Sequence, residues 1–273
     1  MATQEKRVSL YFLVAGYPFA RDTMEPSKEY LFNHKGCYFA ALYTSLEQGK
    51  KEMKNKQGPN KIFSFSGTVW TQNILSLVIY EGHRNGTEDV ENMDRIPWLE
   101  YNIKNMDYAA LPAPRVFATH LPYYLTPRDL RNKRVIYVTR NPKDVVVSYF
   151  HFSKIMYTLE EVSDFNLFLE RFLAGKVLGG SWVDHVTGWY SHAQDFNILF
   201  LTYEEMKKDL RSVVLKICNF LGKQLSEEEV ESVVRQATFE NMKKDPRANY
   251  EKIDREGTYQ IQHQVANKNF QQV

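Results

Sequence analysis

A short strand-like run that stops at a strong helix start is the feature of this sequence that most restricts its fold. Residues 134–139 read Arg-Val-Ile-Tyr-Val-Thr, and β-branched and aromatic residues of this kind are typical of a buried strand. Arg140 follows, and then Asn141 and Pro142, which suit the N-cap and the first position of a helix. The sequence therefore predicts a buried strand that leads directly into a helix, the repeating unit of α/β folds.

The same order of strand and helix recurs along the chain. Apolar runs are short and β-rich where strands are expected, and have helical spacing where helices are expected. Predicted strands cover residues 62–65, 115–119, 134–139 and 197–202. Predicted helices cover residues 68–75, 143–153, 203–221 and 226–236, and the capping-box pair Ser226 and Glu229 opens the last of them. The fold class is therefore α/β: a single domain whose mostly parallel central sheet is flanked by helices, with a P-loop-like strand–turn–helix unit.

Polar residues follow these strands at their carboxyl ends. Ser66, His120, Arg140 and Tyr203 each lie at or just past the end of a predicted strand. The carboxyl ends of parallel strands meet at one edge of the sheet, and ligands bind there. These four positions are therefore the first candidates for a functional site.

Arg140 is a candidate for holding an anion. The helix after it is well capped, and its N-terminus carries a partial positive charge and offers free N–H groups, so the two together suit a phosphate. Ser148 lies about two turns into that helix, and its hydroxyl can help only a phosphate that lies along the helix. In the alternative interpretation Arg140 pairs with a nearby carboxylate such as Asp144, and Ser148 is a packing residue.

The turn Ser66-Gly67-Thr68 is a second candidate for phosphate binding. A glycine between strand and helix, flanked by hydroxyls, lets the backbone approach a phosphate closely. The tripeptide alone is weak evidence, because it recurs by chance. No GxxxxGK[ST] motif is present and no lysine lies in the turn, which argues against a P-loop nucleotide hydrolase or a nucleotide kinase.

His120 follows an apolar strand, and two roles are open to it. A single histidine in apolar surroundings is more often structural than functional. As a functional residue it suits a general base, because histidine titrates near neutrality.

Composition limits the classes of partner. The net charge of +2 is too small to predict binding to nucleic acid or to an anionic membrane, although local basic residues can still hold a small anion. No apolar run reaches the roughly 18 residues that span a bilayer. Aromatic residues make up 14% of the chain, which fits either core packing or a pocket for a flat apolar ligand.

The cysteines and the N-terminus bear on the compartment. Cys37 and Cys218 have no CxxC or metal-like spacing, so two buried thiols in a reducing compartment are expected rather than a disulfide. The apolar run over residues 8–15, after Lys6 and Arg7, has the outline of a signal peptide, but it is short and lacks a clean cleavage site. We therefore expect a cytoplasmic protein.

Five segments together resemble the cytosolic sulfotransferase family. They occur in the family's order and at its spacing, and the resemblance covers roughly residues 62–252. From Ile79 onward the sequence is most similar to the amine sulfotransferase branch. The five segments are residues 66–72 (SGTVWTQ), 120–125 (HLPYYL), 140–144 (RNPKD), 148–152 (SYFHF) and 245–250 (DPRANY).

The resemblance implies a donor, an acceptor and a set of site residues. The donor is 3′-phosphoadenosine 5′-phosphosulfate, used without a metal, and the acceptor is an amine or a hydroxyl of a small hydrophobic molecule. His120 would take the acceptor's proton, and Arg140 with Ser148 would hold the 3′-phosphate. The other implied nucleotide contacts are Ser66, Gly67, Thr68, Val69, Trp70, Tyr203, Thr238, Phe239 and Met242.

The sequence departs from the family pattern in two places. The family's phosphosulfate loop reads Tyr-Pro-Lys-Ser-Gly-Thr, and here Phe65 stands where the lysine is expected. Lys61 is no substitute, because it lies five residues before Ser66, roughly 16 Å along an extended strand. The family also continues into a basic, glycine-containing stretch that closes the 3′-phosphate clamp, whereas residues 257–273 here are rich in Gln and Asn.

These observations give a domain scheme and two hypotheses of function. We expect a disordered extension over residues 1–24, an incomplete sulfotransferase-like domain over 25–256 and a disordered tail over 257–273. The first hypothesis is a sulfotransferase whose activity is reduced or lost. The alternative is a non-catalytic nucleotide- or partner-binding protein that keeps the fold. Without the family's C-terminal dimer contact, we expect a monomer or a weak homodimer.

Overall fold

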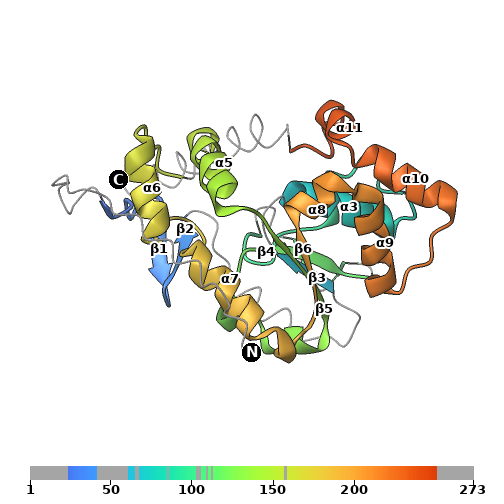
Figure 1. Cartoon of the computed structure of the whole chain (residues 1–273), viewed down its shortest axis with the longest axis horizontal. Coiled ribbons are helices and arrows are strands. Elements are labelled where there is room, and N and C mark those ends of the chain that lie inside the picture. The colour runs from blue at the N-terminus through green and yellow to red at the C-terminus, as the bar shows by residue number, and fades with distance from the viewer. Residues whose placement is uncertain are drawn as a thin grey trace, which may run out of the picture.

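Parallel strands form the centre of the described structure (Figure 1). The computed structural model describes residues 24–41, 61–64, 68–84, 86–102, 106–108, 110–111, 113–156 and 159–250. Within these residues the strands of the central sheet, in the spatial order β4-β3-β5-β6, are β3 (Lys61–Ser64), β4 (Val116–Thr119), β5 (Arg134–Thr139) and β6 (Asn197–Thr202). Every neighbouring pair is parallel, which confirms the predicted sheet type.

Helices lie on both faces of this sheet, and a small antiparallel hairpin lies beside it (Figure 1). The described α-helices are α3 (Thr68–Ile79), α4 (Asn92–Arg95), α5 (Pro142–Ile155), α6 (Phe165–Leu173), α7 (Trp182–Ser191), α8 (Tyr203–Lys208), α9 (Leu210–Leu221), α10 (Glu227–Gln236) and α11 (Phe239–Lys244). Short 3-10 helices cover Tyr123–Leu125, Arg128–Asn132 and Ala193–Asp195, and the hairpin consists of β1 (Leu31–His34) and β2 (Cys37–Ala40).

Strand β5 is apolar on both sides because both of its faces are buried. Ile136 and Val138 belong to a cluster with residues of α3, α9 and α10. Val135 and Tyr137 belong to the opposite cluster, which includes Trp189 of α7 and residues of β2. Burial on both faces is typical of parallel strands and explains the unbroken apolar run in the sequence.

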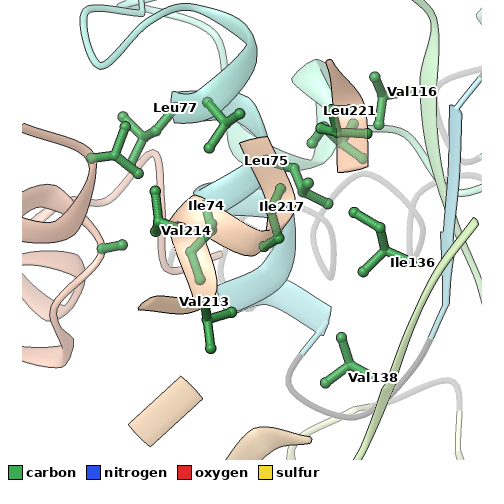
Figure 2. Close-up of a cluster of buried hydrophobic side chains, with 14 of the residues drawn as sticks. Ile74, Leu75, Leu77, Val116, Ile136, Val138, Val213, Val214, Ile217 and Leu221 are labelled. Atoms are coloured by element: carbon green, nitrogen blue, oxygen red, sulfur yellow. The ribbon is translucent and has the colours of Figure 1, made fainter. Parts of the chain in front are cut away.

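The cluster around α3 and α9 offers a test of the packing. Figure 2 shows Ile217 of α9 among its neighbours, and this residue is fully buried. We expect Ile217→Ala to lower the free energy of unfolding by about 2–5 kcal/mol, because the methylene groups lost leave a cavity. Leu215 of the same helix is 40% exposed, so Leu215→Ala is expected to cost less than about 1 kcal/mol. Urea unfolding followed by circular dichroism measures both, and equal losses would contradict this packing.

Several predicted elements are confirmed, and their caps explain why. Strands β5 and β6 have the predicted bounds. Helix α5 begins at Pro142, and the side chain of its N-cap, Asn141, accepts a hydrogen bond from the Lys143 N–H. Helix α10 opens with the predicted capping box of Ser226 and Glu229.

The single helix predicted over residues 203–221 is wrong, since two helices occupy this range. Helix α8 ends at Lys208 and α9 begins at Leu210. Asp209 separates them, because its side chain accepts a hydrogen bond from the Ser212 N–H and so caps α9 as a new helix. Its extended backbone, with φ at −150°, cannot continue α8.

Other elements were not predicted, and some predictions cannot be compared with the structure. The sequence reading missed α6, α7, α11 and the β1–β2 hairpin. The Ser66-Gly67 turn, Phe65, the predicted extension apart from Met24, and the tail over 257–273 lie outside the described residues. No helix among the described residues is both long and apolar enough to cross a bilayer.

Candidate active site

The carboxyl ends of the parallel strands bring the predicted site residues to one edge of the sheet. Ser64 of β3 lies opposite Thr119 of β4, and Thr139 of β5 lies opposite Thr202 of β6. His120, Arg140 and Tyr203 each come directly after one of these strands. Strand β3 pairs with β4 on one side and with β5 on the other, so the direction of the strand order reverses between β3 and β5. Such a switch point is where open α/β sheets bind ligands.

Arg140 presents an uncommitted guanidinium group at this edge. Its Cζ lies 4.4 Å from the centre of the Tyr203 ring, a cation–π contact that holds the side chain in place. Its Nε is buried and has no hydrogen-bond partner among the described residues. No described ion pair joins Arg140 to Asp144 or to another carboxylate. The arrangement therefore favours the anion-binding interpretation over the salt-bridge alternative.

Aromatic contacts connect Arg140 to two more of the predicted residues, Tyr203 and Trp70. The Tyr203 ring meets Trp70 of α3 edge to face, with 5.3 Å between ring centres. Trp70 Nε1 donates a 2.7 Å hydrogen bond to the Ala237 carbonyl, directly before Thr238, the N-cap of α11. We call Trp70, Arg140, Tyr203, Thr238 and Phe239 the candidate nucleotide surface. These contacts bring residues from four distant segments together, and Phe239 follows Thr238 directly in the chain.

The start of α11 combines a buried and an exposed apolar side chain. Phe239 is 75% exposed, which is unusual for a large apolar ring and leaves its face open. Met242, about one turn later, is buried at 9% exposure. At the other side of the surface Thr68 begins α3, and the Val69 carbonyl accepts a hydrogen bond from Asn92 Nδ2.

The expectation of free N–H groups at the start of α5 is wrong. Pro142 has no N–H, and the Lys143 N–H donates to the Asn141 side chain. The N–H groups of Asp144 and Val145 both donate to the Asn141 carbonyl at 3.0 Å. The helix tip is thus satisfied internally, and an anion here must be held by side chains, chiefly the Arg140 guanidinium. Ser148 is exposed further along α5.

His120 lies at the end of β4 with one edge of its ring accessible. Its side chain is 33% exposed, and its ring stacks on Trp98 with 4.3 Å between centres. His120 Nδ1 lies 3.6 Å from Oε1 of Glu100, a residue that the sequence reading did not single out. The sequence does contain a signal for Glu100, because it is the one charged residue in the otherwise apolar segment 96–101. Partial exposure with a fixed ring plane suits a base more than a packing residue.

A second histidine near this edge has a structural role. His185 of α7 is buried, and its Nδ1 lies 2.9 Å from the Tyr137 hydroxyl oxygen. Burial lowers the pKa of His185 to about 3, so its ring stays neutral at physiological pH. His185 therefore has the features of a structural core residue rather than of a base.

Metal and thiol chemistry have no visible basis in the described part of the chain. No three His, Cys, Asp or Glu side chains gather there in a way that could hold a metal ion. Cys37 and Cys218 are free and buried, as predicted. Desolvation raises the pKa of both thiols, so neither is a reactive thiolate.

The fold of the described residues is that of the sulfotransferase class of group-transfer enzymes. Residues 63–271 match the sulfotransferase domain family. The chain therefore belongs to the sulfotransferase family, which confirms the resemblance seen in its sequence and the prediction of a sulfotransferase enzyme.

Three individual proteins illustrate the similarity. The amine sulfotransferase of the rabbit, Oryctolagus cuniculus, is 53% identical over 236 residues, which cover 84% of this chain and 78% of that protein. Sulfotransferase 1A1 of Bos taurus is 37% identical over 195 residues, 69% of this chain and 66% of that protein. The crystal structure of mouse sulfotransferase SULT7A1 complexed with PAP has a TM-score of 0.64 and 32% sequence identity, and the match covers 78% of this chain and 76% of that one.

Proposed function

We propose that this chain transfers a sulfuryl group from 3′-phosphoadenosine 5′-phosphosulfate to a small hydrophobic acceptor, preferentially an amine. The main support for this proposal is the Arg140 guanidinium group, which stacks on Tyr203 and whose buried Nε has no described hydrogen-bond partner. His120 lies at the same edge of the sheet. The mouse relative is complexed with PAP, which supports a nucleotide of this type as the ligand. The rabbit relative, named amine sulfotransferase, supports an amine as the acceptor.

The candidate nucleotide surface suits the two ends of such a donor. Arg140 offers a guanidinium fork to the 3′-phosphate, and Ser148 adds its hydroxyl. Trp70, Tyr203 and Phe239 offer aromatic faces to the adenine. The family resemblance assigns the phosphosulfate to the motif Ser66, Gly67, Thr68 and Val69, of which Thr68 and Val69 begin α3, and it assigns further nucleotide contacts to Thr238 and Met242. The donor supplies the activated sulfuryl group, and the chain binds and orients it.

His120 then acts on the acceptor. Its ring nitrogen takes the proton from the attacking amine or hydroxyl while a new bond forms between that atom and sulfur. The bond from sulfur to the phosphate oxygen breaks, and 3′-phosphoadenosine 5′-phosphate leaves with the electron pair. No metal and no redox step enters this balance.

The expected rate of this reaction depends on the residue that replaces the family's loop lysine. Phe65, in place of the expected lysine, leaves charge on the departing phosphate unneutralised and reduces or abolishes turnover. The second candidate function is that of a non-catalytic nucleotide-binding protein. Phe65 favours it, because the missing lysine affects catalysis. We propose a cytoplasmic protein, monomeric or weakly dimeric, without a nucleic-acid or membrane partner.

Titration with 3′-phosphoadenosine 5′-phosphate tests the nucleotide site. We expect micromolar affinity from isothermal calorimetry of the purified chain. Arg140→Ala is expected to weaken binding about 10- to 100-fold, because a hydrogen bond to a charged group contributes about 1.5–3 kcal/mol.

A matched control separates local contact from overall charge. Arg131 is 60% exposed and pairs only loosely with Asp195, at 3.7 Å. Arg131→Ala removes the same charge and is expected to change the affinity less than about twofold. Equal weakening by the two substitutions, or tight binding by Arg140→Ala, would show that Arg140 does not hold the phosphate.

A further inference from the structure

A buried carboxylate lies beside the proposed base. The Glu100 side chain is 1% exposed, and its Oε1 accepts a 2.6 Å hydrogen bond from the backbone N–H of His120. The same oxygen lies 3.6 Å from His120 Nδ1. The other oxygen, Oε2, has no hydrogen-bond partner among the described residues. Glu100 is therefore a deeply buried acid whose one ion-pair contact among the described residues is with His120.

Backbone pairing fixes Glu100 next to His120. The Ala118 N–H donates to the Pro97 carbonyl at 2.9 Å, and Trp98 forms a parallel bridge with Ala118. The segment after Pro97 thus runs alongside β4 in register. Glu100 and His120, each two residues beyond the bridge, therefore lie opposite one another without depending on a flexible loop.

The same pairing orients the imidazole ring. Trp98 stacks on one face of His120, with 25° between the ring planes, and so limits rotation of the ring. Nδ1 lies towards Glu100, which leaves Nε2 on the edge remote from this carboxylate. The His120 side chain is 33% exposed, and we assign the contact with the acceptor to Nε2 because Nδ1 lies towards Glu100.

Burial of an ionised carboxylate lowers the stability of the folded protein unless a positive charge or hydrogen bonds compensate it. The negative charge of Glu100 affects the neighbouring Cys37. Burial is the larger cause and the Glu100 charge the smaller cause that raise the pKa of the Cys37 thiol to about 12. Neither Cys37 nor another described side chain forms an ion pair with Glu100 apart from His120. A positive charge that develops on the His120 ring during the reaction would meet this carboxylate in a medium of low polarity.

We infer that Glu100 is a positioning residue that orients His120 through Nδ1–H and stabilises the imidazolium formed when Nε2 takes the acceptor's proton. The inference rests on the proposed function of His120 as general base. A separation of 3.6 Å is longer than a hydrogen bond, and such contacts tighten when substrate binds and charge develops. Because the interaction strengthens in the transition state, it raises kcat and leaves KM largely unchanged.

Glu100→Gln tests this role with little change of shape. The amide oxygen of glutamine can still accept the His120 backbone N–H, while the negative charge is lost. We expect kcat to fall about 10- to 100-fold, with the KM for the acceptor and the affinity for 3′-phosphoadenosine 5′-phosphate unchanged within about twofold. Glu81→Gln, which removes a charge at a half-exposed position, is the control and is expected to leave kcat unchanged.

A double substitution separates positioning from a general structural effect. If Glu100 acts through His120, Glu100→Gln has no further effect on the rate of the His120→Ala variant. A tenfold loss in that background as well, or a rise in KM at constant kcat, overturns the inference.

A measurement without turnover distinguishes this inference from the proposed function. Nuclear magnetic resonance of the chain with nitrogen-labelled histidine, assigned with the His120→Ala variant, reports which ring nitrogen carries the proton. We expect the Nδ1–H tautomer for neutral His120. The Nε2–H tautomer overturns the inference whatever the activity. The Nδ1–H tautomer in a chain that shows no sulfuryl transfer, even as Phe65→Lys, would contradict the proposed function and leave the Glu100 contact standing.

Discussion

Replacement of His120 by alanine is expected to lower the rate of sulfuryl transfer by about 10²- to 10⁴-fold, the range typical of a lost general base. Binding of 3′-phosphoadenosine 5′-phosphate is expected to stay within about tenfold, because the described cation–π and ring contacts at the nucleotide surface join Arg140, Tyr203 and Trp70. Rates with a radiolabelled donor and calorimetric affinities measure the two effects separately. The Phe65→Lys background serves where the wild-type rate falls below detection.

An exposed histidine provides the control for this prediction. His83 lies just past the end of α3, at the opposite end of this helix from Trp70, and it is exposed. His83→Ala is therefore expected to leave the transfer rate unchanged. Retention of activity by His120→Ala would show that another group takes the acceptor's proton. A parallel loss of nucleotide binding would mean that the substitution disrupts the sheet edge instead.

Introduction of the missing loop lysine is expected to have the second large effect. Phe65→Lys should raise the transfer rate about 10²- to 10³-fold, because one preorganised contact to the charge developing on a leaving group contributes about 2.7–4 kcal/mol. Lys61 cannot supply this charge, since it begins β3 and so lies at the opposite end of the strand from the site. Initial rates at saturating donor and acceptor measure the change.

A neutral substitution at the same position identifies the cause. Phe65→Met removes the aromatic ring without adding a charge, and is expected to raise the rate less than about threefold. A similar gain from methionine and lysine would mean that the ring, rather than the missing charge, limits turnover. No gain from lysine, in a chain that binds the nucleotide, would show that the missing positive charge at position 65 does not limit turnover.

The central strands can be predicted from the sequence because burial on both faces leaves a strong local pattern. Residues 134–139 and 197–202 form strands with the predicted bounds. The start of α5 is equally readable, because the Asn141 side chain satisfies the backbone locally and Pro142 fits only the first turn. In each case the interactions that decide the structure lie within a few residues of one another.

Elements decided by a single side chain or by weak periodicity were harder to predict. The apolar spacing over residues 203–221 continues through Asp209, so only the cap formed by this residue ends one helix and starts the next. Helix α6 had a usable signal that was overlooked: Phe165, Phe168 and Phe172 follow helical spacing, and the Asp164 side chain accepts a hydrogen bond from the Asn166 N–H.

The residues of the candidate site could be predicted from the sequence, but the contacts that join distant segments there could not. Arg140 and His120 follow strand ends, which the sequence shows. The bond from Trp70 to the Ala237 carbonyl spans 167 residues, and no local pattern indicates it. The same holds for Glu100, whose place beside His120 depends on the pairing of its segment with β4.

The central claim is that this sheet edge performs sulfuryl transfer. The most direct test is the transfer of radiolabel from 3′-phosphoadenosine 5′-phosphosulfate to a small hydrophobic amine, with the wild-type chain and Phe65→Lys assayed side by side. We expect slow transfer by the wild-type chain, a faster rate with the new lysine, and loss of both on His120→Ala. A folded chain that binds 3′-phosphoadenosine 5′-phosphate and transfers no label in either form would contradict it, and would identify a protein that keeps the nucleotide site without the chemistry.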